Sequence, residues 1–277
     1  MNPFRRGSIV LVLGMHRSGT SALARVLSLA GARLPRTLFE AVEGDNDLGY
    51  WESRRLIERH EALFERLGTT MLAGEPVDPA WFRSRDAALE EAALARIVHE
   101  EWSGGFGRAS RCWVVKEPRI CRLMPLWRGV LARTGRRVAA VHAIREPAQV
   151  AASLARRDGM PAVRAERAWL EHVLSAERWS RDLPRAFTTF DGLLDDWRGT
   201  VARVAALLPR GDLDARRAEA GVAAFLAPGM RHHRDAPAPG CPEVAAARDE
   251  LLAAARDARA PDEALLDGAW RRAFEAR

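Results

Sequence analysis

The chain has 277 residues, 48% of them hydrophobic, which is enough to build a sizeable core as one large α/β domain or two small ones. The longest apolar run near the start, residues 9–13, is too short for a membrane span or a secretory signal, so we expect a cytoplasmic protein without a stable membrane anchor. The net charge of +6 comes from 43 basic residues spread among 37 acidic ones, which argues against a nucleic-acid partner and favours discrete anion sites.

Hydrophobic periodicity, taken in chain order, predicts strands that alternate with helices. Strands are expected at residues 8–13, 113–115, 137–144 and 186–190. Helices are expected at residues 20–30, 124–133, 148–157, 165–183 and 193–208. This alternation predicts the α/β class, with a three-layer fold in which helices flank a central parallel sheet, and a single domain over residues 1–277.

A mostly helical insertion, at about residues 34–101, separates the first two predicted strands. Its residues Leu56, His60, Leu63, Phe64 and Leu67 fall on one helical stripe, and we expect the insertion to cap the ligand end of the sheet. Proline and glycine residues at 235–242 precede a helical tail at about 243–277. The sequence leaves open whether this tail packs on the domain or serves an oligomer, and the oligomeric state stays open with it.

Residues 14–21 follow a predicted strand and open a predicted helix, the context of a phosphate-binding loop. Both glycines and Ser21 match the nucleotide-binding pattern, but Thr20 stands where that pattern has its lysine. The strand at 137–144 is followed by Arg145 and not by the acidic residue that helps to hold magnesium. The three widely spaced cysteines do not indicate a zinc site. The sequence therefore predicts anion binding without a metal requirement.

The loop residues Arg17-Ser18-Gly19-Thr20-Ser21 resemble the 5′-phosphosulfate loop, [KR]-S-G-T-[TS], of sulfotransferases that use 3′-phosphoadenosine 5′-phosphosulfate (PAPS). Arg145 followed eight residues later by Ser153 resembles the family's pair for the 3′-phosphate, and Arg157 matches a second arginine of the tyrosylprotein branch. The resemblance implies a P-loop-containing fold, PAPS as donor and adenosine 3′,5′-bisphosphate as product. The residues implied in binding are Arg17, Ser18, Gly19, Thr20, Ser21, Arg145, Ser153 and Arg157.

Lys116 is the only lysine among the 43 basic residues. It opens the segment Lys116-Glu117-Pro118-Arg119, which resembles the K-[DE]-P segment of the tyrosylprotein and bacterial branches of the family. The resemblance implies that Lys116, together with Arg17, stabilises charge during sulfuryl transfer. The competing interpretation is an exposed lysine at a strand end.

A carboxylate is the expected general base, because no histidine lies between His99 and His142, the region where the small-molecule branch keeps its basic histidine. We favour Glu52, since residues 48–52 resemble the G-[FY]-[FW]-E segment of bacterial sulfotransferases. Glu40 and Glu43 are alternatives, and Glu52 is also placed to favour the start of the next helix.

Several functional points remain open at this level. Ala22 stands where many small-molecule sulfotransferases have an adenine-stacking tryptophan, so the adenine platform is unassigned. The basic run Arg231–Arg234 is expected either to close over the nucleotide or to form a solvated loop. We expect a small-molecule or glycan acceptor, with a saccharide or glycolipid as the first candidate. The alternative functions are a P-loop small-molecule kinase and a non-catalytic nucleotide-binding protein.

Overall fold

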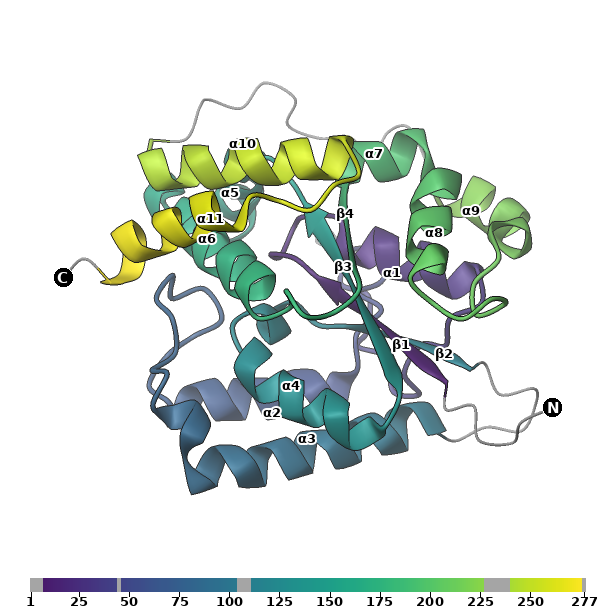
Figure 1. Cartoon of the computed structure of the whole chain (residues 1–277), viewed down its shortest axis with the longest axis horizontal. Helices are drawn as coiled ribbons and strands as arrows, with labels where there is room; N and C mark the ends of the chain where they lie inside the picture. Colours follow the sequence, from purple (N-terminus) through teal and green to yellow (C-terminus); the bar gives the residue numbers. More distant parts are fainter. Residues whose placement is uncertain (1–6, 44–45, 104–110, 227–239, 276–277) are drawn as a thin grey trace.

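A computed structural model describes residues 7–43, 46–103, 111–226 and 240–275. Its four-stranded sheet is parallel throughout, in the order β2-β1-β3-β4 (Figure 1). The strands are β1 (Ser8–Leu13), β2 (Cys112–Lys116), β3 (Arg137–Ile144) and β4 (Arg185–Thr189). The parallel sheet and the helices around it confirm the predicted α/β class, and the predicted bounds of β1 and β3 are confirmed to the residue.

Helices pack on both faces of the sheet. They are α1 (Thr20–Leu29), α2 (Arg54–Arg66), α3 (Arg85–Ser103), α4 (Met124–Thr134), α5 (Pro147–Asp158), α6 (Ala162–Arg178), α7 (Phe190–Asp195), α8 (Trp197–Ala206), α9 (Glu219–Phe225), α10 (Pro242–Arg256) and α11 (Glu263–Trp270). Short helical turns are η1 (Trp81–Arg83), η2 (Pro118–Cys121), η3 (Ala215–Ala218) and η5 (Arg271–Glu275). Within the described ranges, no helix is long and apolar enough to cross a membrane.

The three layers follow from the alternation of side chains along β1. Ile9, Leu11 and Leu13 pack into one core with α2, α3 and α4. Val10 and Val12 point to the opposite face and pack with α1 and α8. Of the predicted stripe of the insertion, Leu56, Leu63 and Phe64 pack in this core as part of α2, and Leu67 packs against it just after the helix.

The order of the strands creates a ligand crevice. The chain leaves β1 toward β2 on one side and leaves β3 toward β4 on the other, so β1 and β3 flank a topological switch point. Open α/β sheets bind ligands outside the carboxyl ends of such strands. In the sheet register Val12 lies beside both Lys116 and Val141, so the segments that follow the three strands begin at the same edge.

Two boundary predictions are wrong near the end of the sheet. The predicted fourth strand includes Phe190, but β4 ends at Thr189, whose hydroxyl accepts a hydrogen bond from the Gly192 amide and caps α7. The single helix predicted over 193–208 is two helices, because Asp196 accepts a hydrogen bond from the Gly199 amide and begins α8.

The helix predicted over residues 165–183 ends early. Helix α6 starts at Ala162 and stops at Arg178, after which Trp179 and Ser180 close turns onto the preceding carbonyl groups. Leu183 precedes Pro184, and a residue before proline is disfavoured in the helical region. Apolar residues after Arg178 therefore extend the helical pattern in the sequence but not the helix itself.

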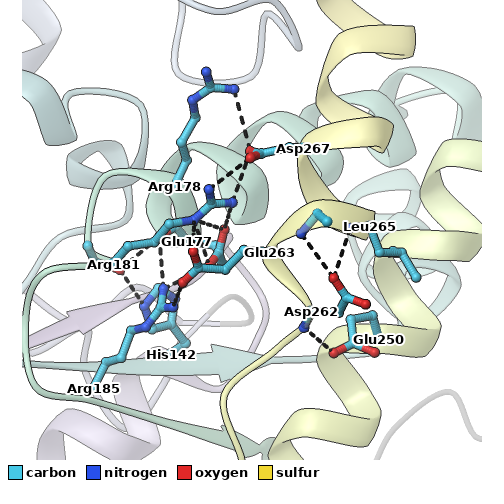
Figure 2. Close-up of polar contacts among 12 residues, drawn as sticks. His142, Glu177, Arg178, Arg181, Arg185, Glu250, Asp262, Glu263, Leu265 and Asp267 are labelled. Atoms are coloured by element: carbon cyan, nitrogen blue, oxygen red, sulfur yellow. Dashed lines mark hydrogen bonds and ion pairs between the residues drawn. The ribbon is translucent and has the colours of Figure 1, made fainter.

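The C-terminal tail packs on the domain. Val244, Leu251 and Leu266 are buried in one core with Trp169 of α6 and Phe187 of β4. An ion-pair group, here called the tail clamp, joins α6, the turn after it and the start of β4 to α11 (Figure 2). It consists of Glu177, Arg181, Arg185, Glu263 and Asp267, with distances of 2.7–3.0 Å for its main contacts.

Candidate functional site

The loop between β1 and α1 turns tightly, and no side chain of its N-cap residue caps the start of α1. Gly14 and Gly19 have φ angles of 150° and 83°, and a Cβ at these positions would lie 2.5 Å from the Ala143 carbonyl oxygen and 2.4 Å from the Phe190 ring. Gly19 supplies no side-chain cap, and the first turn of α1 has no acidic residue. The Ser18 hydroxyl is buried and has no hydrogen-bond partner in the part of the chain that the structure describes. This environment suits an anion.

Three of the predicted binding residues converge beside the loop. Arg17 donates from Nε to the Ser153 hydroxyl on α5 at 2.8 Å, and Arg145 donates to the Arg17 carbonyl oxygen at 2.8 Å. They come from the loop, the end of β3 and α5, and Arg17 contacts both Arg145 and Ser153. Arg157 lies one turn further along α5 and pairs with Asp158 at 2.7 Å.

A cavity of 250 Å³, here called the loop cavity, opens at this edge of the sheet. Of the predicted site residues, it is lined by Arg17, Gly19, Thr20, Ser21, Glu52, Lys116, Arg145 and Arg157. Ser18 and Ser153 are buried next to these residues and are absent from the lining. The structure therefore brings eight of the ten predicted donor-binding and catalytic residues to the wall of one cavity, with Ser18 and Ser153 behind them.

Lys116 is buried in this edge and does not extend into solvent. Its Nζ donates to the Ser21 hydroxyl at 3.0 Å and to the Tyr50 carbonyl oxygen at 3.2 Å, and it pairs with the Glu52 carboxylate. The Lys116 and Glu52 side chains are only 3% and 5% exposed. Burial raises the pKa of Glu52, Lys116 opposes this rise and the nearby charge of Glu117 adds to it. Glu52 therefore has a raised pKa while it pairs with a cation.

A second cavity of 510 Å³, here called the side cavity, adjoins the first. Both are lined by His16, Tyr50, Glu52 and Arg157, so Glu52 lies where the two cavities meet. The rest of the side cavity comes mainly from the insertion and combines apolar residues with charged ones. These are Phe39, Glu40, Ala41, Val42, Arg54, Ile57, Glu58, Glu61, Met71 and Arg119.

The two alternative bases occupy different places from Glu52. Glu40 lines the side cavity, but its side chain is 82% exposed and pairs with Arg54 at 2.6 Å. Glu43 is exposed and lines neither cavity. Glu52 itself lies just before Ser53, which caps α2 through its own hydroxyl. Capping of α2 therefore does not account for the buried position of Glu52.

Some residues of the site carry no role in the sequence-based hypothesis. Phe190 lines the loop cavity and lies 5.1 Å from the Arg145 guanidinium, and Asn46 donates to the Ser21 hydroxyl at 3.2 Å. Only its position in the sequence could have identified Phe190, because it follows the fourth strand at the carboxyl ends of the strands, here called the ligand edge. Ala22 also lines the loop cavity. The basic run Arg231–Arg234 lies outside the described residues.

Comparisons with known proteins give weak likenesses. No family model matches the chain, and a search of curated proteins gives no match. Among solved structures, the chain is similar to the sulfotransferase domain of the Synechococcus PCC 7002 olefin synthase, with 15% identity and a TM-score of 0.40 over 100% of this chain and 99% of the other. It is also similar to sulfotransferase STF1 from Mycobacterium tuberculosis H37Rv, with 18% identity and a TM-score of 0.42 over 77% and 71% of the two chains. Likenesses of this strength leave the function to be judged from the site.

Proposed function

We propose that this protein is a sulfotransferase that moves a sulfuryl group from PAPS to a hydroxyl or amine acceptor. One observation carries the proposal: the only lysine of the chain is buried beside the phosphate-type loop and pairs with Glu52, where the loop cavity meets the side cavity. A cation at the anion end and a carboxylate at the entrance to a second cavity are the two groups that an in-line group transfer to an alcohol needs.

The residues of the loop cavity fit the donor. The buried Ser18 hydroxyl and the uncapped start of α1 suit the 5′-phosphosulfate, whose close approach the two loop glycines permit. Arg145, Ser153 and Arg157 would hold the 3′-phosphate. When bound, the donor supplies an activated sulfuryl group on a 5′-phosphate leaving group.

Different residues of the chain would handle the proton and the developing negative charge in the transfer. Glu52 accepts the proton of the acceptor hydroxyl as the new sulfur–oxygen bond forms, and its raised pKa suits a general base. Lys116 and Arg17 stabilise the negative charge that develops on the 5′-phosphate oxygen as the old sulfur–oxygen bond breaks. The mixed apolar and charged wall of the side cavity favours an acceptor with an apolar part, such as a glycolipid, over a plain saccharide.

The alternative functions fit these residues less well. A P-loop kinase needs a lysine in the loop, but Thr20 lines the loop cavity at that position, and Arg145 rather than an acidic residue follows β3. A non-catalytic nucleotide-binding protein has no need of a buried carboxylate at the entrance to a second cavity. Because Thr20 and Arg145 replace the groups that a kinase uses with magnesium, the proposed transfer requires no metal ion.

Calorimetry tests the donor assignment. Adenosine 3′,5′-bisphosphate in the presence of EDTA should bind at least tenfold more tightly than AMP, because charge-assisted bonds to the 3′-phosphate are worth about 1.5–3 kcal/mol. Arg145→Met should bring the two affinities close together. Equal affinities in the wild type, or binding of ATP that depends on magnesium, would overturn the assignment. A screen of hydroxyl and amine acceptors with labelled donor then tests the transfer itself.

A further inference from the structure

A chain of buried side chains runs from the core to the side cavity. It begins at Trp127 on α4, whose indole Nε1 donates to His60 Nε2 on α2 at 3.0 Å. The indole nitrogen can only donate, so His60 Nε2 accepts, and in the neutral ring the proton lies on Nδ1. His60 Nδ1 then donates to the Glu117 carboxylate. His60 and Glu117 are both fully buried.

The second half of this chain holds a guanidinium at the side cavity. The other oxygen of Glu117 accepts from Arg119 NH1 at 2.7 Å and from the Arg119 amide at 3.1 Å. Arg119 also pairs with Glu61 at 2.7 Å, but the Glu61 side chain is 59% exposed, whereas that of Arg119 is 7% exposed. Glu117 therefore fixes Arg119 from the core, and Arg119 lines the side cavity together with Glu52.

Three charged groups act on the carboxylate of Glu52. Lys116 and Arg119 lower its pKa, and Glu117 raises it. Burial alone would raise the pKa of Glu117, but Arg119 and His60 hold it well below its ordinary value, so Glu117 stays charged. The other charged or titratable groups that line both cavities with Glu52 are His16, Tyr50 and Arg157. Those in the loop cavity alone are Arg17, Asp47 and Arg145, and those in the side cavity alone are Glu40, Arg54, Glu58 and Glu61.

We propose that Arg119 is a positioning residue for the reaction: held by the chain of Trp127, His60 and Glu117, it cancels the charge of Glu117 so that Glu52 remains a carboxylate when Lys116 turns toward the donor. This inference rests on the proposed function. Without Arg119, Glu52 would face the charge of Glu117 as soon as Lys116 is engaged elsewhere. It would then take up a proton and lose its capacity as a base.

Proton uptake on nucleotide binding gives a readout that does not depend on turnover. Calorimetry with adenosine 3′,5′-bisphosphate at pH 7, in buffers of different ionisation enthalpy, measures the protons bound along with the nucleotide. The wild type should take up close to none, and Arg119→Met should take up a substantial fraction of one proton. Adding Glu52→Gln to Arg119→Met should abolish the uptake, which assigns the proton to Glu52. No uptake by Arg119→Met would overturn the proposal.

The pH profile of turnover provides the second test, in which Glu117→Gln and Arg119→Lys do not depend on the folding of Arg119→Met. Removing one of the charges that act on Glu52 should move the acid limb by about one pH unit. The acid limb should shift to higher pH in Arg119→Met and to lower pH in Glu117→Gln. It should return toward the wild-type position in Glu117→Gln/Arg119→Met and stay near it in Arg119→Lys. An unmoved limb in Glu117→Gln would overturn the proposal.

The outcomes separate this inference from the proposed function. If the wild type fails to bind adenosine 3′,5′-bisphosphate, the donor assignment fails first. If binding and turnover are found but the limbs do not move, only the role of Arg119 fails. A purely structural role for Arg119 would lower turnover equally at all pH values, and removing Glu117 as well would not restore the profile.

Discussion

The ligand edge and the tail clamp both contain buried charge, but they use it differently. At the ligand edge Lys116 pairs with a single carboxylate, Glu52; both residues line the loop cavity, and Glu52 also lines the side cavity. In the tail clamp Arg181 bonds to Glu177 and Asp267, and Arg185 bonds to Glu177 and Glu263 (Figure 2). The residues of the clamp line neither the loop cavity nor the side cavity. A buried pair beside a cavity can exchange partners with a ligand, whereas a clamp whose arginines each hold two carboxylates joins elements of the fold.

Replacing Lys116 should produce the largest loss of turnover. A small loss would contradict the contrast between a functional pair at the ligand edge and a structural clamp at the tail. Lys116→Ala removes one preorganised donor to developing charge, so turnover at saturating donor should fall about a hundred- to a thousandfold. Lys116→Arg should recover only part of this loss, because its planar fork delivers the charge in a different place. Affinity for adenosine 3′,5′-bisphosphate and the melting temperature serve as controls for folding. Full activity of Lys116→Arg would refute a role that needs the ammonium.

Glu52→Gln tests the other half of the pair. Turnover should fall on the order of a hundredfold, because the amide cannot accept the acceptor's proton, while nucleotide binding persists. Glu40→Gln is the matched control, since Glu40 lines the same side cavity but is exposed and paired with Arg54. Its turnover should stay near the wild-type value. Normal turnover in Glu52→Gln together with a loss in Glu40→Gln would move the base to Glu40.

Arg181→Met sharpens the comparison from the side of the tail clamp. The change leaves the carboxylate of Glu177, whose side chain is 1% exposed, with Arg185 as its remaining cation in the clamp, so the free energy of unfolding should fall by about 2 kcal/mol. Nucleotide affinity should not change. Arg198→Met is the control, because its pair with Glu219 is exposed on both sides, so this change should lower the free energy of unfolding much less. Equal losses of stability in the two variants, measured by urea unfolding, would contradict a special role for the clamp.

Much of the sheet and of the ligand edge could be predicted from the sequence, because both follow from local patterns. The apolar runs at 8–13 and 137–144 match β1 and β3, and the loop at 14–21 lies between β1 and α1 as expected. Arg17, Arg145 and Ser153 come together because parallel strands present their carboxyl ends at one edge, so residues placed after each strand converge.

The parts that the sequence does not predict depend on packing between distant segments. The place of Phe190 in the loop cavity depends on where β4 stops, which a hydrogen bond from Gly192 to Thr189 decides. The hydrogen bonds from Trp127 through His60 to Glu117 join α4, α2 and the start of η2. The sequence indicates His60 only as one member of a helical stripe. The docking of the tail likewise depends on arginines that resemble any other exposed arginine in this sequence.

The packing of α10 on β4 has a consequence for the order in which the chain is made. Strand β4 is an edge of the sheet and is complete at Thr189, but the helix that packs on it begins only at Pro242. During synthesis the strand therefore emerges well before this helix, and in that interval the part of the core around Phe187 that α10 covers is exposed to other chains. A chain that stops before Pro242 would leave these apolar side chains exposed permanently and should be prone to aggregation, even though the ligand edge described here is already encoded in it.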